Sequence, residues 1–393
     1  MTDSRSLILV LSVFVVAVCS LVYELIAGAV SSYLLGSSIT QFSLVIGVFL
    51  AAMGLGSFLS KFFEQDLIAR FVQVEIATGF VGGFSALALF LAFTYSNTFY
   101  AFLLLVTGSV GTLIGLEIPL IIRILRERDT SLRLTVANVM TADYVGALVA
   151  SLSFPFLLVP YLGLMRASFL MGLLNLAVGC LCLSVFKEEM GRSLWRVRIF
   201  ALVSTLLLVA GFLGSAKLVK LVEDDLYPDE IILARQSKYQ RIVLTKWRND
   251  IRLFLDSKLQ FSTIDEYRYH ECLVHPPMAA KKGRVERVLI LGGGDGMAAR
   301  EVLKYPDVRQ ITLVDLDPVI TKIFKENDYL AELNDYSLRN EKVKVINSDA
   351  MRFLEESKER FDVVLVDLPD PNNFSLGKLY TLSFYELITS RLN

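Results

Sequence analysis

The chain has 393 residues, of which 54% are hydrophobic and 20% are charged, and its formal net charge is −1 at pH 7. This balance excludes nucleic-acid binding through a basic surface, and the length exceeds that of one ordinary domain. The four cysteines lack the spacing of a disulfide framework, and two histidines are too few for a histidine-based metal site. We therefore predict neither disulfides nor a metal.

The first half of the chain consists of repeated apolar stretches. They lie at about 7–29, 41–60, 71–94, 99–122, 134–154, 164–186 and 199–219. Each is close to the ~20 residues that a helix needs to cross a bilayer, and the first is too long for a cleaved signal peptide. Small residues within them suit close helix packing in lipid, namely Gly47, Gly54, Gly56, Gly79, Gly82 and Gly83. The sequence therefore predicts a multi-pass transmembrane domain of about seven helices over residues 1–222.

Three acidic residues, Glu24, Glu117 and Asp143, lie within these apolar stretches or near their ends. An ionisable group is costly inside a membrane, so one interpretation is a path or cluster that admits a cationic amine. The other is purely structural, with each acid hydrogen-bonded to a neighbouring helix. Polar side chains available for such bonds include Asn138, Thr141 and Asn175.

Residues 229–263 follow a charged junction and carry short β-rich runs. The runs lie at 231–234, 241–246, 251–256 and 258–262. Turn residues at 248–250 and 256–257 separate them, which is typical of hairpins. We therefore expect a small antiparallel β-hairpin domain, followed by a helix at 267–282 that two adjacent prolines interrupt.

A glycine-rich segment stands between two apolar runs in the last third of the chain. The run at 288–291 is short enough for a buried parallel strand, and Gly292, Gly294 and Gly296 follow it. A helical pattern at 297–304 leads to a second run at 311–314, which ends in Asp315. This is a βαβ unit whose glycines allow close approach of a ligand and whose acid can accept both hydroxyls of a ribose. The Gly-x-Gly-x-Gly spacing favours a nucleoside ligand over a dinucleotide.

Two further strands are predicted at 343–346 and 362–366, with helices at 318–327, 351–357 and 379–391. The strands lead into Asp349 and into Asp367 and Asp370, so every predicted strand end carries polar residues. Ligands in open α/β sheets bind beyond the carboxyl ends of the strands. We therefore expect these side chains to lie along one edge of the sheet.

The predicted fold is a multi-pass α-helical membrane domain, a small antiparallel β-domain and an α/β Rossmann-like (class I methyltransferase-like) domain over residues 264–393. A complete sheet of this type would continue beyond the fourth strand, which would otherwise leave an exposed edge. We therefore expect that the sequence is truncated at its C-terminal end.

Several separated segments, taken together, resemble the spermidine synthases (polyamine aminopropyltransferases). The matching segments are Tyr239-Gln240, Leu255-Asp256 with Gln260, Asp265-Glu266 with Tyr269-His270-Glu271, the glycine segment at 292–296, Asp349-Ala350, and Asp367 with Asp370-Pro371. The resemblance covers residues 231–393, and the whole chain is similar to the membrane-integral bacterial variant of that family. The order of the segments makes the match far more specific than the glycine turn alone.

The resemblance implies a transferase that moves an aminopropyl group from decarboxylated S-adenosylmethionine to an amine such as putrescine, giving spermidine and 5′-methylthioadenosine. This co-substrate would be the only cofactor, with none tightly bound. The implied general base is Asp367. The implied nucleoside site consists of Gln240, Gly292, Gly294, Gly296, Asp315, Asp349 and Ala350. The implied amine site consists of Tyr269, His270, Asp295 and Asp370.

Elementary chemistry agrees with the role of Asp367. Both substrates are cations, which an acidic rim stabilises, and one carboxylate must take a proton from the attacking amine. The alternative is that Asp367 and Asp370 only form a turn before Pro371. Two departures from the family pattern, Leu368-Pro369 and Met297, put the identity of the acceptor in doubt more than the class of reaction.

Two other functions stay open on the sequence alone. One is an S-adenosylmethionine-dependent methyltransferase on the same fold, and the other is a polyamine transporter or sensor whose soluble domain binds without turnover. The expected partners are a polyamine, the lipid bilayer and, in a homodimer, a second copy of the chain.

The predicted location is the cell (inner) membrane. Two considerations disagree about the side of the membrane on which the soluble domain lies. Lys and Arg gather in alternate connections, so the positive-inside rule puts the N-terminus in the cytoplasm. Seven crossings would then place the soluble domain outside, away from an adenosyl co-substrate. We expect a cytoplasmic soluble domain because the co-substrate is supplied there.

Overall fold

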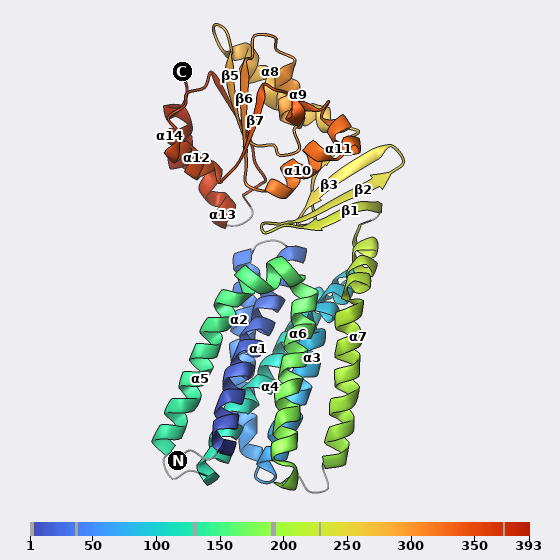
Figure 1. The fold of residues 1–393 in the computed structure, drawn as a ribbon, viewed down its shortest axis with the longest axis vertical. Coiled ribbons are helices and arrows are strands. Elements are labelled where there is room, and N and C mark those ends of the chain that lie inside the picture. The colour runs from blue at the N-terminus through green and yellow to red at the C-terminus, as the bar shows by residue number, and fades with distance from the viewer. Residues whose placement is uncertain (1–3, 36–37, 129–131, 190–193, 228, 372–373) are drawn as a thin grey trace. The chain divides into compact units, whose positions relative to one another are not determined.

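The computed structural model describes residues 4–35, 38–128, 132–189, 194–227, 229–371 and 374–393. The chain divides into two compact units, Met1–Leu226 and Tyr227–Asn393. In the first, called here the helical unit, every described secondary-structure element is a helix. The second, the α/β unit, contains every described strand (Figure 1).

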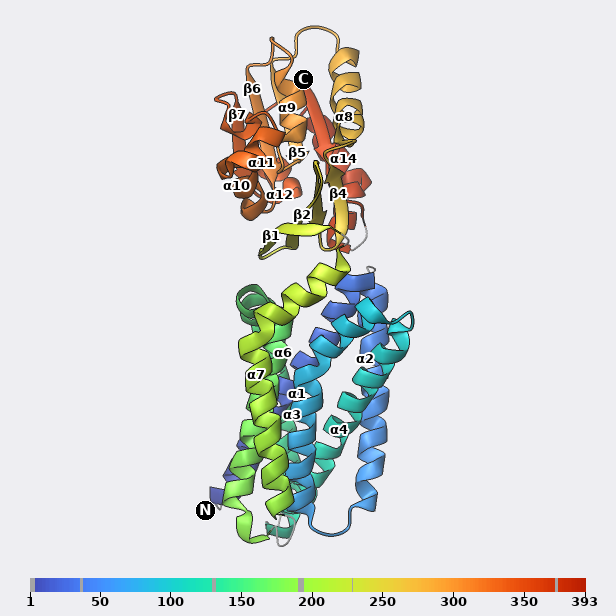
Figure 2. The same cartoon turned by 90° about the vertical axis from the view of Figure 1, so that its right-hand side faces the viewer.

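The described part of the helical unit contains seven α-helices, and each runs opposite to the one before it (Figures 1 and 2). They are α1 (Ser4–Leu35), α2 (Ser38–Leu59), α3 (Leu67–Tyr95), α4 (Phe99–Arg128), α5 (Leu132–Ser153), α6 (Val159–Val185) and α7 (Leu194–Leu226). A π-helical segment, Phe154–Leu158, joins α5 to α6. By length and composition, six continuous stretches of the described chain could cross a membrane, with α5 and α6 counted as one stretch of 53 residues.

Small residues let some of these helices touch through their backbones. A Cβ atom on Gly56 of α2 would lie 2.0 Å from the carbonyl oxygen of Thr112 in α4. A Cβ on Gly79, Gly82 or Gly83 would lie 2.7, 2.6 or 2.5 Å from a side chain of a neighbouring helix, so the predicted close packing is confirmed there. The prediction of close helix packing is wrong for Gly47 and Gly54. A Cβ on Gly47 or Gly54 would meet no heavy atom within 4 Å.

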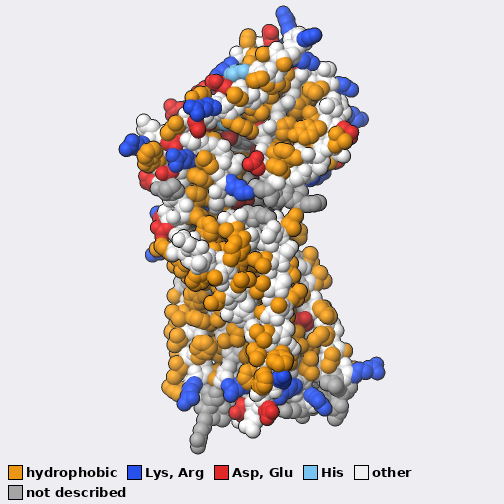
Figure 3. All heavy atoms as spheres, turned by 180° about the vertical axis from the view of Figure 1, so that it is seen from behind, with side chains coloured by type: hydrophobic (Ala, Val, Ile, Leu, Met, Phe, Trp, Pro, Cys, Tyr) orange, Lys and Arg blue, Asp and Glu red, His pale blue; other side chains and the backbone are white. Residues whose placement is uncertain are grey.

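The face of the helical unit that Figure 3 shows carries many hydrophobic side chains. Large apolar side chains stand far out of the bundle, including Leu105 at 65% exposure and Leu213 at 75%. Contiguous exposed apolar surface of this kind marks a region that another apolar phase or partner covers.

The α/β unit begins with a four-stranded antiparallel sheet in the order β1-β2-β3-β4. Its strands are β1 (Glu230–Gln236), β2 (Arg241–Trp247), β3 (Asp250–Leu255) and β4 (Lys258–Ser262). Arg248 has a positive φ in the β2–β3 turn, and Asp256 and Ser257 do in the β3–β4 turn. The predicted hairpins are therefore confirmed.

A second sheet has four parallel strands in the order β7-β6-β5-β8. The strands are β5 (Arg287–Gly292), β6 (Gln310–Asp315), β7 (Val343–Asn347) and β8 (Val363–Asp367). The helices are α8 (Glu266–Ala280), α9 (Met297–Leu303), α10 (Pro318–Glu326), α11 (Asp328–Leu333), α12 (Ala350–Glu356), α13 (Phe374–Gly377) and α14 (Leu382–Ser390). The strand order reverses between β5 and β8, which is where ligands bind in open α/β sheets.

Side chains of the buried strands alternate between two cores. Val288 and Ile290 of β5 face the core that includes Val274 of α8 and Val302 of α9. Leu289 and Leu291 face the opposite core, which includes side chains of α12 and α14. In Figure 1 these two sets of helices accordingly lie on opposite faces of the sheet.

Two helix predictions were wrong in detail. The helix α8 continues through Pro276 and Pro277, because Val274 and Met278 on either side of them are buried in the core. The predicted helix at 379–391 begins later. Thr381 caps α14, where its side chain accepts a hydrogen bond from the backbone N–H of Phe384.

Candidate active site

A cleft of about 370 Å³ lies at the carboxyl ends of β5, β6 and β8. Residues of the small antiparallel sheet, including Leu253 and Leu255, form part of its lining. The predicted site residues that line it are Gln240, Tyr269, His270, Gly292, Gly294, Asp295, Asp315, Asp349, Ala350, Asp367 and Asp370. The structure therefore brings together eleven of the twelve residues singled out from the sequence.

The glycine turn after β5 allows β8 and Asp315 to approach the backbone. Gly292 has φ +87°, and a Cβ there would lie 1.8 Å from the carbonyl oxygen of Asp367. A Cβ on Gly294 would lie 2.6 Å from Oδ2 of Asp315, and the N–H of Gly294 instead donates a 3.0 Å hydrogen bond to that oxygen. Larger residues would close this part of the cleft.

Asp315 ends β6 and lines the cleft. Its Oδ1 accepts a 2.8 Å hydrogen bond from the N–H of Asp317, in addition to the bond from Gly294. Burial raises the pKa of Asp315 to about 6, although both N–H donors favour the charged form. Additional donors, such as the hydroxyls of a ribose, would stabilise the carboxylate further.

Asp367 ends β8 beside the glycine turn, and the N–H of Gly293 donates to its carbonyl oxygen at 3.2 Å. Its Oδ1 accepts a 2.9 Å hydrogen bond from the hydroxyl of Tyr269. Burial, and then the charge of Asp295, raises the pKa of Asp367 to about 6. A carboxylate with such a pKa is a competent proton acceptor near neutral pH.

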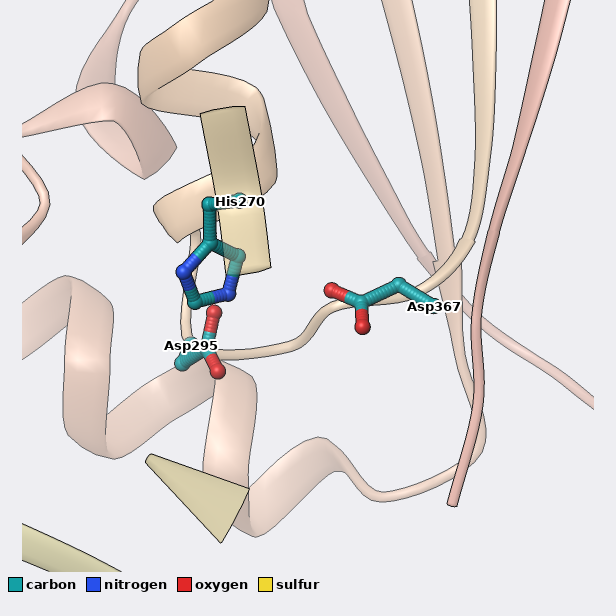
Figure 4. A group of neighbouring side chains, drawn as sticks. All are labelled: His270, Asp295 and Asp367. Carbon is teal, nitrogen blue, oxygen red and sulfur yellow. The ribbon is translucent and has the colours of Figure 1, made fainter. Parts of the chain in front are cut away.

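His270 faces the two acids from α8. In Figure 4 its ring points toward Asp295, and the carboxylate of Asp367 lies beside them. Each of the three residues offers a ligand atom, and these atoms all lie within 4.8 Å of one another. A small cationic group could contact all three.

Glu266 orients His270 from one turn earlier in α8. Nδ1 of His270 donates to a carboxylate oxygen of Glu266 at 2.7 Å, and Arg300 donates to the same carboxylate at 2.8 and 3.0 Å. Burial lowers the pKa of His270, but the bond to Glu266 and the charges of Asp295 and Asp367 outweigh it and raise that pKa above its ordinary value. The imidazole is thus a fixed donor from Nδ1, with Nε2 available to the cleft.

Asp349 has structural partners as well as a place in the cleft. It caps α12, since its Oδ1 accepts from the N–H groups of Met351 and Arg352, and Oδ2 pairs with Lys378 at 2.6 Å. Burial raises the pKa of Asp349, but Lys378 and the N–H donors outweigh burial and lower it. A nucleoside would therefore meet an ion pair here rather than an isolated carboxylate.

Gln240 lines the cleft and is hydrogen-bonded to Asp317, a residue that was not predicted from the sequence. Its Nε2 donates to Oδ2 of Asp317 at 3.1 Å, and Asp317 is only 2% exposed. Asp317 also caps α10, whose first residue is Pro318. An Asp immediately before a Pro is a recognisable helix start and could have identified it. The partner role of Glu266 was also missed.

Gly296 is the one predicted site residue that does not line the cleft. It has φ +81° and begins α9, and its carbonyl oxygen accepts from the hydroxyl of Ser337 at 2.7 Å. The structure gives it a role in the start of the helix. Asp370 does line the cleft but is exposed.

Metal binding was not expected from the sequence, and that stays a prediction. Within the described residues, a second group of possible ligands consists of Glu271, His275 and Glu301. Glu301 already pairs with Lys304 at 2.6 Å and with Arg300 at 3.0 Å. Those cations satisfy its charge.

Residues 266–393 match the spermine/spermidine synthase domain family. The chain is 49% identical to a polyamine aminopropyltransferase of Leptospira interrogans, over 98% of this chain and 77% of that protein. It is 48% identical to polyamine aminopropyltransferase 2 of Ralstonia nicotianae, over 97% and 76%. A crystal structure of spermidine synthase in complex with the transition state analogue AdoDATO is 28% identical, with a TM-score of 0.39, over 42% of this chain and 55% of that one. The chain belongs to the polyamine aminopropyltransferase family.

Proposed function

We propose that the protein is a membrane-bound aminopropyltransferase that uses decarboxylated S-adenosylmethionine as its co-substrate and a diamine such as putrescine as its acceptor. The observation that carries this proposal is the position of Asp367. Its carboxylate lies in the cleft beside the glycine turn, bonded to Tyr269, and burial raises its pKa to about 6. Among the described residues, no other carboxylate of the cleft combines a hydrogen bond from Tyr269, a raised pKa and a position next to His270.

The donor would occupy the side of the cleft formed by β5 and β6. Its ribose hydroxyls would donate to Asp315, and its base would lie near Ala350 and the ion pair of Asp349 with Lys378. Gly292 and Gly294 leave room for the nucleoside at this edge. The sulfonium charge would then face the acidic part of the cleft.

The acceptor would occupy the opposite side, where Tyr269, His270, Asp295 and Asp370 lie. Its nitrogen lone pair attacks the methylene carbon attached to the sulfonium sulfur. The carbon–sulfur bond breaks, the sulfur keeps the electron pair, and the nucleoside leaves as a neutral thioether. The proton of the attacking nitrogen passes to Asp367, whose carboxylate must be ionised at that moment.

The experiment that tests this reaction is an assay of the purified full-length protein with putrescine and each form of the cofactor. We expect spermidine and 5′-methylthioadenosine with decarboxylated S-adenosylmethionine. A methylated product from S-adenosylmethionine would instead identify a methyltransferase. Binding of both ligands with no product would identify a transporter or sensor.

Membrane attachment is part of the proposal. It is supported by the six apolar stretches of the described chain and by the exposed hydrophobic side chains of the helical unit. The cell (inner) membrane is the proposed location, and fractionation of cells should recover the activity with the membranes and release it with detergent. A homodimer stays a prediction.

The α/β unit is proposed to face the cytoplasm, where its co-substrate is made. The opposing consideration is the Lys and Arg distribution of the helical unit, which favours the other side. Cys272 is exposed in the α/β unit, whereas Cys19 and Cys182 are buried in the helical unit. A membrane-impermeant maleimide should therefore label Cys272 only after cell lysis. Labelling of intact cells that Cys272→Ser abolishes would place this unit outside.

A further inference from the structure

A cavity of about 130 Å³ lies inside the helical unit, between α1, α2, α4 and α5. Its lining includes the three acids that stood out in the sequence, Glu24, Glu117 and Asp143. The remaining lining is apolar apart from Ser20, whose hydroxyl donates to the carbonyl oxygen of Val16. The three acids therefore line one partly open pocket rather than lying at separate helix contacts.

The hydrogen bonds expected between these acids and neighbouring helices are largely absent. Asn175 donates to Glu75 instead, and Thr141 donates to the carbonyl oxygen of Ala137. Within the described residues, Glu24 and Asp143 have no hydrogen bond or ion pair. The interhelical hydrogen bonds predicted for these two residues are therefore not formed in the described structure.

The carboxylate of Glu117 supplies an independent observation in favour of a ligand site. It is 2% exposed and lines the cavity. One carboxylate oxygen, Oε1, accepts a 3.1 Å hydrogen bond from Thr78, whereas Oε2 has no donor among the residues that the structure describes. Oε2 itself is not a fully buried atom, so it opens onto the cavity, and a side chain this buried is costly to charge unless a donor reaches that oxygen.

Among the described residues, no positively charged side chain lines the cavity beside these acids. The residues lining the cavity include no Lys, Arg or His. Glu75, which is fully buried in α3 and accepts a 3.0 Å hydrogen bond from Asn175, is a further acid inside the same bundle. Such a concentration of acids in an apolar bundle favours a cationic ligand.

We propose that this cavity binds one organic ammonium ion. Its size is close to that of an engineered cavity of about 150 Å³ that holds benzene, so a short alkylammonium would fit. The methylenes would contact apolar side chains such as Phe49 and Ile114, while the ammonium donates to Glu117. This site is separate from the amine site of the proposed transferase reaction.

A small inorganic cation fits the cavity less well. Calcium, for example, needs about six to eight oxygen ligands that converge on one point. Two groups of three possible ligands in the described chain have their ligand atoms within 4.8 Å of one another, and neither group includes these three acids. Dispersed carboxylates around an apolar space suit an extended organic cation.

The test is equilibrium dialysis of the purified full-length protein in detergent with radiolabelled 1,4-diaminobutane. The Asp295→Asn/Asp367→Asn variant serves as the background, because it removes acids of the α/β cleft and isolates the second site. We expect one equivalent bound per chain in this background. Glu117→Gln should weaken that binding at least ~10-fold, since a buried charge-assisted hydrogen bond is lost.

Two further variants make the result decisive. Ala147→Leu fills the cavity from α5 without removing a charge, and should weaken binding as Glu117→Gln does even if the latter folds poorly. Glu64→Gln removes an exposed acid of the same unit and should bind like the background protein. Absence of binding in the background, unchanged binding in Ala147→Leu, or displacement by Na⁺ as readily as by butylammonium would each overturn the proposal.

Discussion

The hydroxyl of Tyr269 donates a 2.9 Å hydrogen bond to Oδ1 of Asp367, across 98 residues of sequence. Burial, followed by the charge of Asp367, raises the pKa of Tyr269 well above its ordinary range, so the phenol stays a donor at any working pH. One carboxylate oxygen is thereby held in place by the protein. The other is left for the proton of the acceptor amine.

Replacement of the base tests its role directly. Asp367→Asn keeps the shape of the side chain but cannot take a proton, so kcat should fall by about 10²–10⁴. Steady-state kinetics measure this, with circular dichroism to show that the fold is intact. Asp307→Asn, at an exposed turn of the same unit, is the matched control and should retain normal kcat. Near-normal turnover in Asp367→Asn would refute the assignment.

The hydrogen bond from Tyr269 should lower the pKa of Asp367, because it favours the charged carboxylate. In Tyr269→Phe the acid limb of the kcat/KM profile should therefore move to higher pH, and kcat should fall roughly 10-fold, the scale of one hydrogen bond to a charged group. Tyr267→Phe alters an exposed tyrosine of the same helix and should change neither. A fall in rate without the pH shift would mean that Tyr269 only fills space.

The charge of Asp295 should have the opposite effect. Since the pKa of Asp367 is raised to about 6, the base is ionised above that pH and kcat/KM of the wild-type protein should fall as the pH drops through about 6. Asp295→Asn removes a negative neighbour, so its acid limb should lie at lower pH than that of the wild type. An acid limb at the same pH in both proteins would exclude this coupling.

Much of the α/β unit could be predicted from the sequence because its signals are local. The β-branched runs set the strands, and parallel strands necessarily present their carboxyl ends along one edge. This rule alone predicts that Asp315, Asp349 and Asp367 lie near one another, and all three line the cleft. The position of Gln240 came from the resemblance, since it depends on a contact with Asp317 that lies 77 residues away.

Other features depend on contacts that no local pattern encodes. Glu75 lies in a predicted membrane span, yet its burial against Asn175 of α6 becomes evident only once the helices are packed. The pairing of Lys378 with Asp349 likewise joins distant segments. The continuation of α8 through two prolines follows from the burial of Val274 and Met278, which outweighs the local helix-breaking preference.

Asp315 should control affinity for the donor rather than the chemical step. Asp315→Asn keeps an acceptor oxygen but loses the charge that strengthens its hydrogen bonds to ribose hydroxyls. We expect KM for the nucleoside donor to rise about 10-fold or more, with kcat changed much less, since charge-assisted bonds contribute roughly 1.5–3 kcal/mol. Initial rates at varied donor concentration separate the two effects. An equal loss of kcat would instead point to a role in the reaction itself.

The packing of α2 against α4 can be tested with two glycines that lie two residues apart in α2. A Cβ at Gly56 would lie 2.0 Å from the carbonyl oxygen of Thr112, whereas a Cβ at Gly54 would meet no heavy atom within 4 Å. Gly56→Val should therefore force the helices apart and lower the melting temperature of the detergent-solubilised protein, on the scale of about 1–3 kcal/mol for overpacking. Gly54→Val makes the same chemical change at an open position and should melt like the wild type. Equal melting temperatures for the two variants would show that α2 and α4 do not touch through Gly56.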